Sequence, residues 1–518
     1  MKTLKSYVCG GWHEANRDFA LLYDPSTEEP IARASSAGID FPAVLDFARE
    51  RGGPALRALS FAERAGLLKE MSKALRERRD ELLELQALNA GATRPDGAFD
   101  LDGGGGTLAY YAAIGRGLGS SRLLADGDSV QLGKSEAWSG RHALAPRRGV
   151  AVLVNAFNFP AWGFAEKAAC ALLAGMPVVV KPATSTAWVT ERCVEILIEA
   201  AILPEGALQL VCGSTGDLLE RLGAQDVLAF TGSATTALRL RGMPNLLAAS
   251  TRINVEADSL NAAVLAPDAT AGSPTFELFL RDVVREMTQK SGQKCTAVRR
   301  ILVPTAEIAT VEEALVERLR QVVTGNPADP GVTMGPLATA QQLADAVAGV
   351  AELRRAARLV HGSGARCDGQ GSPAGKGYFF GPTLLFAENA RAAAAVHSHE
   401  VFAPVATLLP YSGSAQEAGE IVALGGGTLV TSIYSDDPTW RREMVVEAAP
   451  WTGRVYCGSQ AAAPEANGSG AVLPQTLHGG PGRAGGGAEL AGLAGLRLYQ
   501  QKVALQGTRA ELAALLEV

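Results

Sequence analysis

Short apolar segments that alternate with helical segments over residues 150–230 constrain the fold of this chain most strongly. The apolar segments are expected to be buried strands, and they cover 150–154, 177–180, 208–211 and 227–230. The intervening segments 161–173, 188–201 and 217–222 are expected to be helices. Strands buried on both faces and joined by helical crossovers form parallel sheets. The sequence therefore predicts an α/β fold that contains a doubly wound parallel sheet.

The alternation resumes after residue 255, which predicts a second α/β lobe. A helix is expected over 276–289, followed by a turn at Gly292 and an apolar strand over 300–303. Helices are also expected across 55–88, where apolar positions recur at helical spacing. The segment 102–106, an aspartate followed by four glycines, is expected to be a flexible break, and the glycine-rich segment 477–487 a loop. With 518 residues, the chain is long enough for two or three packed lobes.

Composition narrows the range of partners and compartments. Hydrophobic residues make up 47% of the chain, charged residues 20%, and the formal net charge is -6. This composition is typical of a globular protein with no electrostatic footprint for nucleic acid. Seven scattered cysteines without a CxxC pair favour a reducing compartment over a disulfide framework or a zinc site. No apolar run is long enough to span a bilayer, so we expect a cytoplasmic protein.

Two short motifs contain the candidate catalytic groups, a thiol in one and a carboxylate in the other. A Gly-Gln-Lys-Cys turn ends at Cys295, and Glu256 lies upstream in a Val-Glu-Ala-Asp segment. A lone cysteine is usually a small core residue and a lone glutamate a surface charge. Together they can form a covalent thiol adduct with an aldehyde and then activate water.

Further motifs accompany the cysteine turn and the Glu256 segment, and together they occur in the order of one protein family. They are Asn-Phe-Pro at 158–160, Lys181-Pro182, Phe-Thr-Gly-Ser at 230–233 and Glu-Val-Phe-Ala-Pro at 400–404. The chain resembles the aldehyde dehydrogenase superfamily over nearly its full length. The resemblance implies an α/β aldehyde dehydrogenase fold, with a Rossmann-like cofactor domain, an α/β catalytic domain and a small oligomerisation hairpin. It also implies that Cys295 is the nucleophile, Glu256 the general base, and Asn158, with the backbone amide of Cys295, the oxyanion donor. Without the other motifs, Asn158 would be read as a turn residue before Pro160.

The resemblance implies a dinucleotide site. Its expected residues are Phe157, Lys181, Thr184, Gly213, Gly232, Ser233, Glu400 and Phe402. Lys181 would contact the adenosine ribose, Ser233 would cap a helix at the pyrophosphate, and Glu400 would hold the nicotinamide ribose. Thr184 stands where the family usually has a glutamate that repels a 2′-phosphate. We therefore expect NADP to be preferred, with NAD possible but less favoured, unless Thr184 is only a loop residue.

The substrate expectation rests on a departure from the common motif. Asp258-Ser259-Leu260 replaces the usual Gly-Gly-Lys after the general base. This segment, the cysteine turn and the tail from His478 resemble a branch that oxidises CoA-linked semialdehydes in aerobic aromatic degradation, including the benzoyl-CoA pathway. The chain ends at Val518 without a hydratase domain, which favours the branch members that lack one.

Four alternatives remain open at this level. A dehydrogenase of the same branch would act on an oxepin-CoA-derived semialdehyde. An acylating enzyme would need free CoA as acceptor, although Glu256 favours hydrolysis. A simple semialdehyde dehydrogenase would act on CoA-free aldehydes, and an inactive scaffold would lack thiol reactivity. His397 and His399 are expected to be surface residues, and we assign no metal.

The resemblance also divides the chain. Residues 1–126 and 147–256 are expected to form the cofactor domain, 257–476 the catalytic domain, and 127–146 with 477–518 oligomerisation or bridging elements. The expected assembly is a homodimer or a dimer of dimers. The alternative is a surface loop with a frayed tail.

Overall fold

A largely parallel sheet forms the core of the first lobe. The computed structural model describes residues 1–135 and 137–516. Among these residues, the strands of the first sheet have the order β12-β11-β8-β9-β10-β2-β3, and the first five strands in this order run parallel. The strands are β12 (Arg252–Glu256), β11 (Val227–Thr231), β8 (Ala151–Val154), β9 (Val178–Lys181), β10 (Leu208–Leu210), β2 (Ser6–Val8) and β3 (Gly11–His13). The predicted parallel sheet is confirmed, and an antiparallel pair from the N-terminus extends it.

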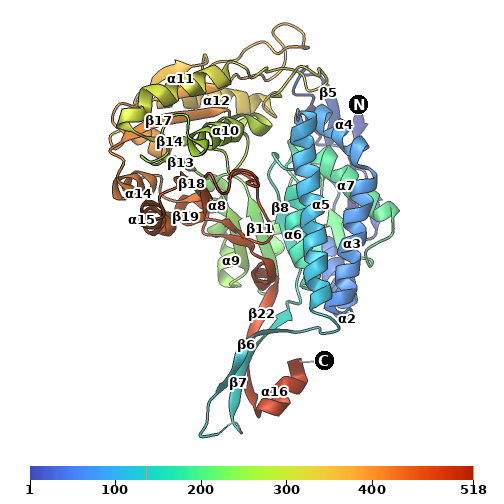
Figure 1. Cartoon of the computed structure of the whole chain (residues 1–518). Helices are drawn as coiled ribbons and strands as arrows, with labels where there is room; N and C mark the ends of the chain where they lie inside the picture. Colours follow the sequence, from blue (N-terminus) through green and yellow to red (C-terminus); the bar gives the residue numbers. More distant parts are fainter. Residues whose placement is uncertain (136, 517–518) are drawn as a thin grey trace.

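A second sheet forms the other lobe, at the upper left of Figure 1. Its order is β15-β16-β17-β14-β13-β18-β19, and all neighbours except β15 and β16 are parallel. The strands are β15 (Arg358–His361), β16 (Thr383–Phe386), β17 (Val405–Tyr411), β14 (Arg300–Pro304), β13 (Ala262–Leu265), β18 (Thr428–Tyr434) and β19 (Thr452–Gly458). The strands on either side of residue 257 thus belong to different sheets. We keep the predicted domain boundaries as a proposal.

Helices cover both sheets and bury their apolar faces there. The first lobe carries α3 (Phe61–Glu77), α4 (Arg79–Ala90), α5 (Arg94–Gly117), α6 (Trp162–Leu173), α7 (Ala187–Glu199) and α8 (Ala234–Arg241). The second carries α10 (Pro274–Thr288), α11 (Ile308–Leu319), α12 (Ala340–Leu353), α14 (Ala415–Ala423) and α15 (Pro438–Ala448). Segment 217–222, predicted to be a helix, contains only a short 3-10 turn at Leu218–Arg221. Among the described residues, no helix has the length and apolar character needed to cross a membrane.

The glycine run at 103–106 lies inside α5, so the predicted flexible break is wrong. Helix α5 runs from Arg94 to Gly117 without interruption and packs on α3 and α6 (Figure 1). A Cβ at Gly103 would overlap the ring of Trp162, and a Cβ at Gly104 would lie 3.2 Å from the Trp162 Cα. Glycine is used here because α5 and α6 approach closely, and this packing outweighs its low helix propensity.

Substituting Gly103 therefore tests the helix contact. Gly103→Ala is expected to destabilise the protein by about 1–3 kcal/mol, because the added methyl overpacks the contact with Trp162. Gly106→Ala is the matched control in the same helix, since nothing lies within 4 Å of its Cβ. It should raise stability by about 0.5–1 kcal/mol through helix propensity. Urea unfolding of both variants measures the difference, and equal stabilities would contradict the packing argument.

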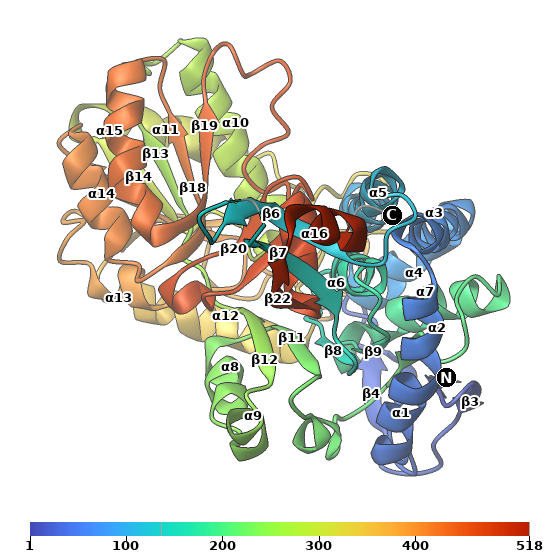
Figure 2. The ribbon, with the colours of Figure 1, turned by 90° about the horizontal axis from the view of Figure 1, so that it is seen from below.

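A three-stranded sheet projects from the body, at the bottom of Figure 1 and in the centre of Figure 2. Strands β6 (Leu124–Gln131) and β7 (Ser139–Pro146) form the predicted hairpin, and β22 (Gln500–Gly507) pairs with β7 along its whole length. Helix α16 (Arg509–Leu516) packs beside this sheet. The glycine-rich segment is not entirely a loop, because β20 (Leu477–Gly479) pairs with β21 (Ala488–Leu490). Residues 517–518 of the predicted bridging element lie outside the described residues.

Candidate active site

One cavity collects side chains from both lobes. It has about 480 Å³ of atom-free space, counting its open mouth. Its lining includes the three predicted catalytic residues Asn158, Glu256 and Cys295, together with Asn155, Glu166 and His478. Asn155, Asn158 and Glu256 lie at or just after the carboxyl ends of parallel strands, the edge where open α/β sheets bind ligands. The fold thus brings together residues that are 137 positions apart in sequence, from Asn158 to Cys295.

A tight turn presents Cys295. Lys290 and Ser291 have φ of 52° and 55°, and Gly292 follows at φ 68°. A Cβ at Gly292 would overlap the backbone of Ala403, so this position requires glycine. Asn261 holds the turn from the other side, since its amide donates to the carbonyls of Cys295 at 2.7 Å and Ala297 at 2.9 Å. Asn261, which immediately precedes β13, therefore holds the backbone of the predicted nucleophile in place.

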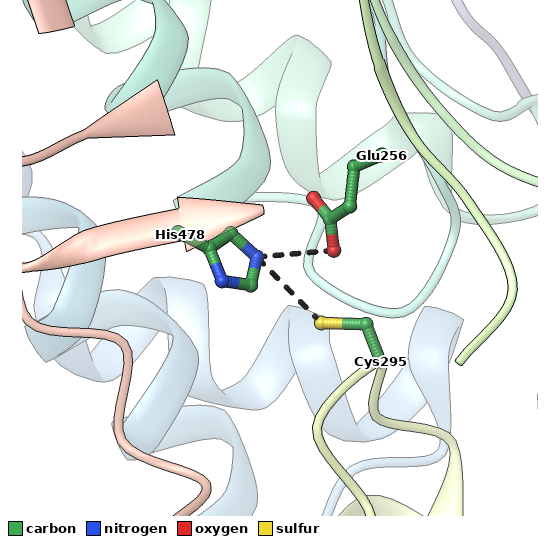
Figure 3. A group of neighbouring side chains, drawn as sticks. All are labelled: Glu256, Cys295 and His478. Atoms are coloured by element: carbon green, nitrogen blue, oxygen red, sulfur yellow. Dashed lines mark hydrogen bonds and ion pairs between the residues drawn. The ribbon is translucent and has the colours of Figure 1, made fainter. Parts of the chain in front are cut away.

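Glu256, Cys295 and His478 form a close group (Figure 3). His478 Nε2 lies 3.0 Å from Glu256 Oε1 and 3.9 Å from Cys295 Sγ. Burial and the Glu256 carboxylate raise the pKa of the Cys295 thiol well above its usual value. Burial would also raise the pKa of Glu256, but His478 and Lys167 hold that pKa below its usual range. The site thus has a protonated thiol beside an ionised carboxylate at neutral pH.

Two asparagine side chains offer amide donors in the cavity. Asn158 is 9% exposed and follows the loop after β8, where the resemblance places the oxyanion donor. Asn155 is 5% exposed, and within the described part of the chain neither polar atom of its side chain has a hydrogen-bond partner. A buried, unsatisfied amide costs free energy unless a ligand pairs with it. Asn155 is therefore a second polar contact for a bound molecule, one that the sequence analysis missed.

A buried charge cluster lies behind Glu256. Lys167 Nζ is 3.1 Å from Glu166 Oε1 and 3.2 Å from Glu489 Oε2, and Asn254 donates to Glu489 at 2.8 Å. Burial raises the pKa of Glu166 to about 7, while the two carboxylates raise that of Lys167 above its usual value despite burial. The signal available in the sequence was an adjacent Glu-Lys pair within the otherwise apolar segment 161–173. Glu166 and Lys167 were not among the predicted site residues.

The predicted adenosine end of the cofactor site has an unpaired cation. Lys181 ends β9, and its Nζ donates to the carbonyl of Pro182 at 2.6 Å. Within the described residues no carboxylate acts on its charge, and burial lowers the pKa of Lys181 to about 8. Thr184 donates to the carbonyl of Gly213 at 3.3 Å, so the two predicted residues lie together. A Cβ at Gly213, whose φ is 117°, would meet the backbone of Ser35 and Ser36. A buried lysine without a counter-ion fits the phosphate group of a dinucleotide.

At the N-terminus of α8, Gly232 and Ser233 lie as predicted. The Ser233 hydroxyl accepts from the backbone N–H of Thr236 and caps the helix, and Gly232 donates to the backbone carbonyl of Glu256. Asp258 also reaches this helix end, where it accepts from the N–H of Ala234 at 2.9 Å. Asp258 thus lies on the predicted pyrophosphate side. A bound pyrophosphate would have to share this helix end with a carboxylate.

Glu400, Phe402 and Phe157 are the remaining residues of the predicted cofactor site. Glu400 accepts from the N–H of Ser259 at 2.9 Å and lies 3.5 Å from Arg299, while burial raises its pKa to about 7. The rings of Phe157 and Phe402 meet edge to face with centroids 5.9 Å apart. These contacts place all three beside one another, and their roles toward a cofactor remain proposals.

The structure contradicts the expectation that His397 lies at the surface. It also shows two groups of side chains that are close enough together to hold a metal ion. His397 is buried because its ring is hydrogen-bonded on both nitrogens, to the carbonyl of Ala390 at 2.6 Å and to Arg300 of β14 at 3.2 Å. Glu256, Cys295 and His478 have ligand atoms within 4.8 Å of one another, and so do Glu166, Glu256 and Glu489. Cys295 is the predicted nucleophile and Glu256 the predicted base, so we still propose no metal.

Comparisons with known proteins show the fold and the family of this chain. The 3,4-dehydroadipyl-CoA semialdehyde dehydrogenase of Aromatoleum evansii is 46% identical over 478 residues, or 92% of this chain and 93% of that protein. PnpE in complex with nicotinamide adenine dinucleotide has the same fold, with a TM-score of 0.84 at 23% identity and 98% coverage of each chain. Lactaldehyde dehydrogenase from Escherichia coli superposes with a TM-score of 0.83 at 24% identity, over 97% of this chain and 99% of that one. The aldehyde dehydrogenase family model matches residues 12–499, so the chain belongs to the aldehyde dehydrogenase family and is an oxidoreductase.

Proposed function

We propose that this enzyme oxidises a CoA-linked semialdehyde to the free carboxylic acid, with NADP as the preferred cofactor. The observation that carries the proposal is the convergence of Asn158, Glu256 and Cys295 on one cavity. The similarity to a 3,4-dehydroadipyl-CoA semialdehyde dehydrogenase supports that compound as the substrate, and hence a role in aerobic benzoate degradation. The reducing compartment expected from the cysteines supports a cytoplasmic location.

The residues of the cavity support a thioester mechanism. Cys295 attacks the aldehyde carbon, and the amide of Asn158 stabilises the negative oxygen by about 2.7–4 kcal/mol. A bound nicotinamide supplies the acceptor for the hydride. Glu256, ionised by its neighbours, then takes a proton from the water that cleaves the thioester on Cys295. The products are the acid and the free thiol.

Hydrolysis distinguishes this proposal from an acylating enzyme. Glu256 lines the same cavity as Cys295, so a base for water is available where the thioester forms. The first test follows NADPH absorbance with 3,4-dehydroadipyl-CoA semialdehyde and with the CoA-free semialdehyde, each with and without free CoA. Turnover that depends on free CoA would favour the acylating alternative. Preference for the CoA-free compound would refute the CoA-linked substrate, and no turnover with either nicotinamide would refute the proposal.

Thr184 is the predicted determinant of the cofactor choice. Thr184→Glu places a carboxylate beside Lys181 and Gly213, where it would repel a 2′-phosphate. Like-charge contacts cost several kcal/mol, so kcat/KM for NADP should fall about 100-fold while that for NAD is retained. Thr184→Gln is the matched control, because it adds the same volume without charge. A strong NAD preference in the unchanged enzyme would show that Thr184 does not select the cofactor.

Lys181 gives the cofactor preference a pH dependence. Burial lowers its pKa to about 8, so the lysine is charged below pH 8 and loses its charge as the pH rises above that value. The KM for NADP should therefore increase above pH 8, whereas the KM for NAD, which lacks the 2′-phosphate, should change less. Steady-state kinetics between pH 7 and pH 9.5 measure both, and parallel curves for the two cofactors would contradict the assignment.

The projecting sheet supports the proposal of a homodimer or a dimer of dimers. Its hairpin exposes large apolar side chains, with Val130 62%, Leu132 48% and Trp138 49% exposed. Such residues on a protruding hairpin are favourable only when a partner covers them. Light scattering measures the mass in solution, and a monomer at micromolar concentration would refute the proposal.

A further inference from the structure

Two serine side chains from distant parts of the chain meet beside the predicted adenosine end of the cofactor site. Ser36 lies in the loop between β5 (Pro30–Ala34) and α1 (Phe41–Phe47), and Ser214 follows β10. Their hydroxyl oxygens are 3.0 Å apart, although the residues are 178 positions apart in sequence. Ser36 is 8% exposed, whereas Ser214 is at the surface. Neither serine belongs to the motifs that predicted the dinucleotide site.

Backbone contacts connect this serine pair to the residues of the predicted site. Gly213, which precedes Ser214, packs so closely on the N-terminal loop that a Cβ there would lie 2.5 Å from the backbone nitrogen of Ser36. Thr184 donates to the carbonyl of the same glycine at 3.3 Å. Lys181 ends the neighbouring strand β9, which runs parallel to β10. Three hydroxyl side chains and one buried lysine therefore lie at the carboxyl ends of β9 and β10, the edge where open α/β sheets bind ligands.

The serine pair can donate hydrogen bonds, and no acid competes for them. Each hydroxyl carries one proton, but the contact between the two oxygens uses only one of these protons. Within the described residues, no carboxylate bonds to either hydroxyl. The nearest acids in sequence are engaged elsewhere, because Asp40 caps α1 and Asp217 pairs with Arg221 at 2.6 Å. Beside the buried Lys181, on which no carboxylate of the described residues acts, such a group of donors favours an anion.

The loop around Ser36 is held in place without the serine pair. Ser35 accepts a hydrogen bond from the N–H of Ala37 at 3.1 Å, and His13 donates to the carbonyl of Ala37 at 2.9 Å. A bond between two neutral hydroxyls also adds little stability, because each group can bond to water instead. The two serine hydroxyls are therefore available to a ligand.

We propose that Ser36 and Ser214 complete, with Lys181 and Thr184, a subsite for the 2′-phosphate of NADP. The inference rests on the proposed cofactor preference and deepens it, because it adds attractive contacts to the missing repulsion at Thr184. Each serine hydroxyl donates to a phosphate oxygen and gives up the bond between the two serines. Hydrogen bonds to a charged group are about twice as strong as neutral ones, so the exchange favours the phosphate. An adenosine ribose without that phosphate leaves the serine pair unchanged, so NAD gains nothing from these two residues.

Calorimetric titration without any aldehyde tests the subsite. The probes are adenosine 2′,5′-bisphosphate, which carries the 2′-phosphate, and adenosine 5′-monophosphate, which lacks it. The unchanged enzyme should bind the bisphosphate more tightly. Ser36→Ala and Ser214→Ala should each raise the Kd of the bisphosphate by about 10- to 100-fold, the cost of one hydrogen bond to a charged group, and leave the Kd of the monophosphate unchanged. Ser214→Thr is the matched control, because it keeps the hydroxyl at an exposed position and should retain most of the affinity.

The possible results separate the subsite from the proposed function. Equal affinities of the unchanged enzyme for the two nucleotides would overturn the inference, and so would alanine variants that bind the bisphosphate normally or lose affinity equally for both. In each case, turnover of the CoA-linked semialdehyde would keep the proposed oxidation. Serine-dependent binding of the bisphosphate without any aldehyde turnover would support the subsite and refute the proposed function. Thermal melting accompanies each titration, and if Ser36→Ala unfolds, the comparison of Ser214→Ala with Ser214→Thr decides.

Discussion

Replacement of Cys295 by alanine is expected to abolish aldehyde oxidation, with a fall in kcat of at least about 10⁴-fold, as for other covalent nucleophiles. The sulfur supplies the electron pair that bonds to the aldehyde carbon, and alanine supplies none. Asn158, Glu256 and the cofactor residues keep their contacts, so the KM for NADP should stay near its original value. The measurement is NADPH formation with the CoA-linked semialdehyde.

The control for Cys295→Ala is Cys457→Ala, which removes an exposed thiol from the end of β19. It should leave kcat unchanged, since Cys457 does not line the cavity. Thermal melting of both variants separates loss of chemistry from loss of folding. Residual turnover above one per cent in a folded Cys295→Ala enzyme would show that the thioester is not an obligatory intermediate.

Replacement of Glu256 by glutamine is expected to separate the two halves of the reaction. Glutamine has the same shape but cannot accept a proton, so the thioester should form in a burst of NADPH and then hydrolyse about 10³-fold more slowly. Removing the carboxylate also removes a charge that raises the pKa of Cys295. The thiol should therefore ionise at lower pH in this variant.

Stopped-flow absorbance resolves the burst, and mass spectrometry of the quenched enzyme detects the acyl group on Cys295. Glu313→Gln, at an exposed position on α11, is the matched control and should show normal steady-state turnover. A normal steady state in Glu256→Gln would refute its assignment as the base for water. A lost burst would instead indicate that Glu256 acts before hydride transfer.

Some helices and strands could be predicted from the local sequence, and others could not. The strands at 151–154, 178–181 and 227–231 are apolar except for Lys181 and Thr231 at their carboxyl ends. Both faces of a parallel sheet are covered, so local composition reveals these strands. The glycines at 103–106 carry the opposite local signal, and only the contact between α5 and α6 explains them. Tertiary packing there outweighs intrinsic propensity.

The sequence by itself determined the family and the parallel sheet, because the motifs and the buried strands are short segments with informative local patterns. For the same reason it made Asn158, Glu256 and Cys295 the candidate catalytic residues. Only the tertiary structure decided that His478, 183 residues after Cys295, approaches the sulfur. It also decided that Lys167 and Glu489, 322 residues apart, form a buried pair behind the base. The physical reason is that pKa values and proton routes depend on distances of a few ångströms between groups whose separation along the chain carries no such information.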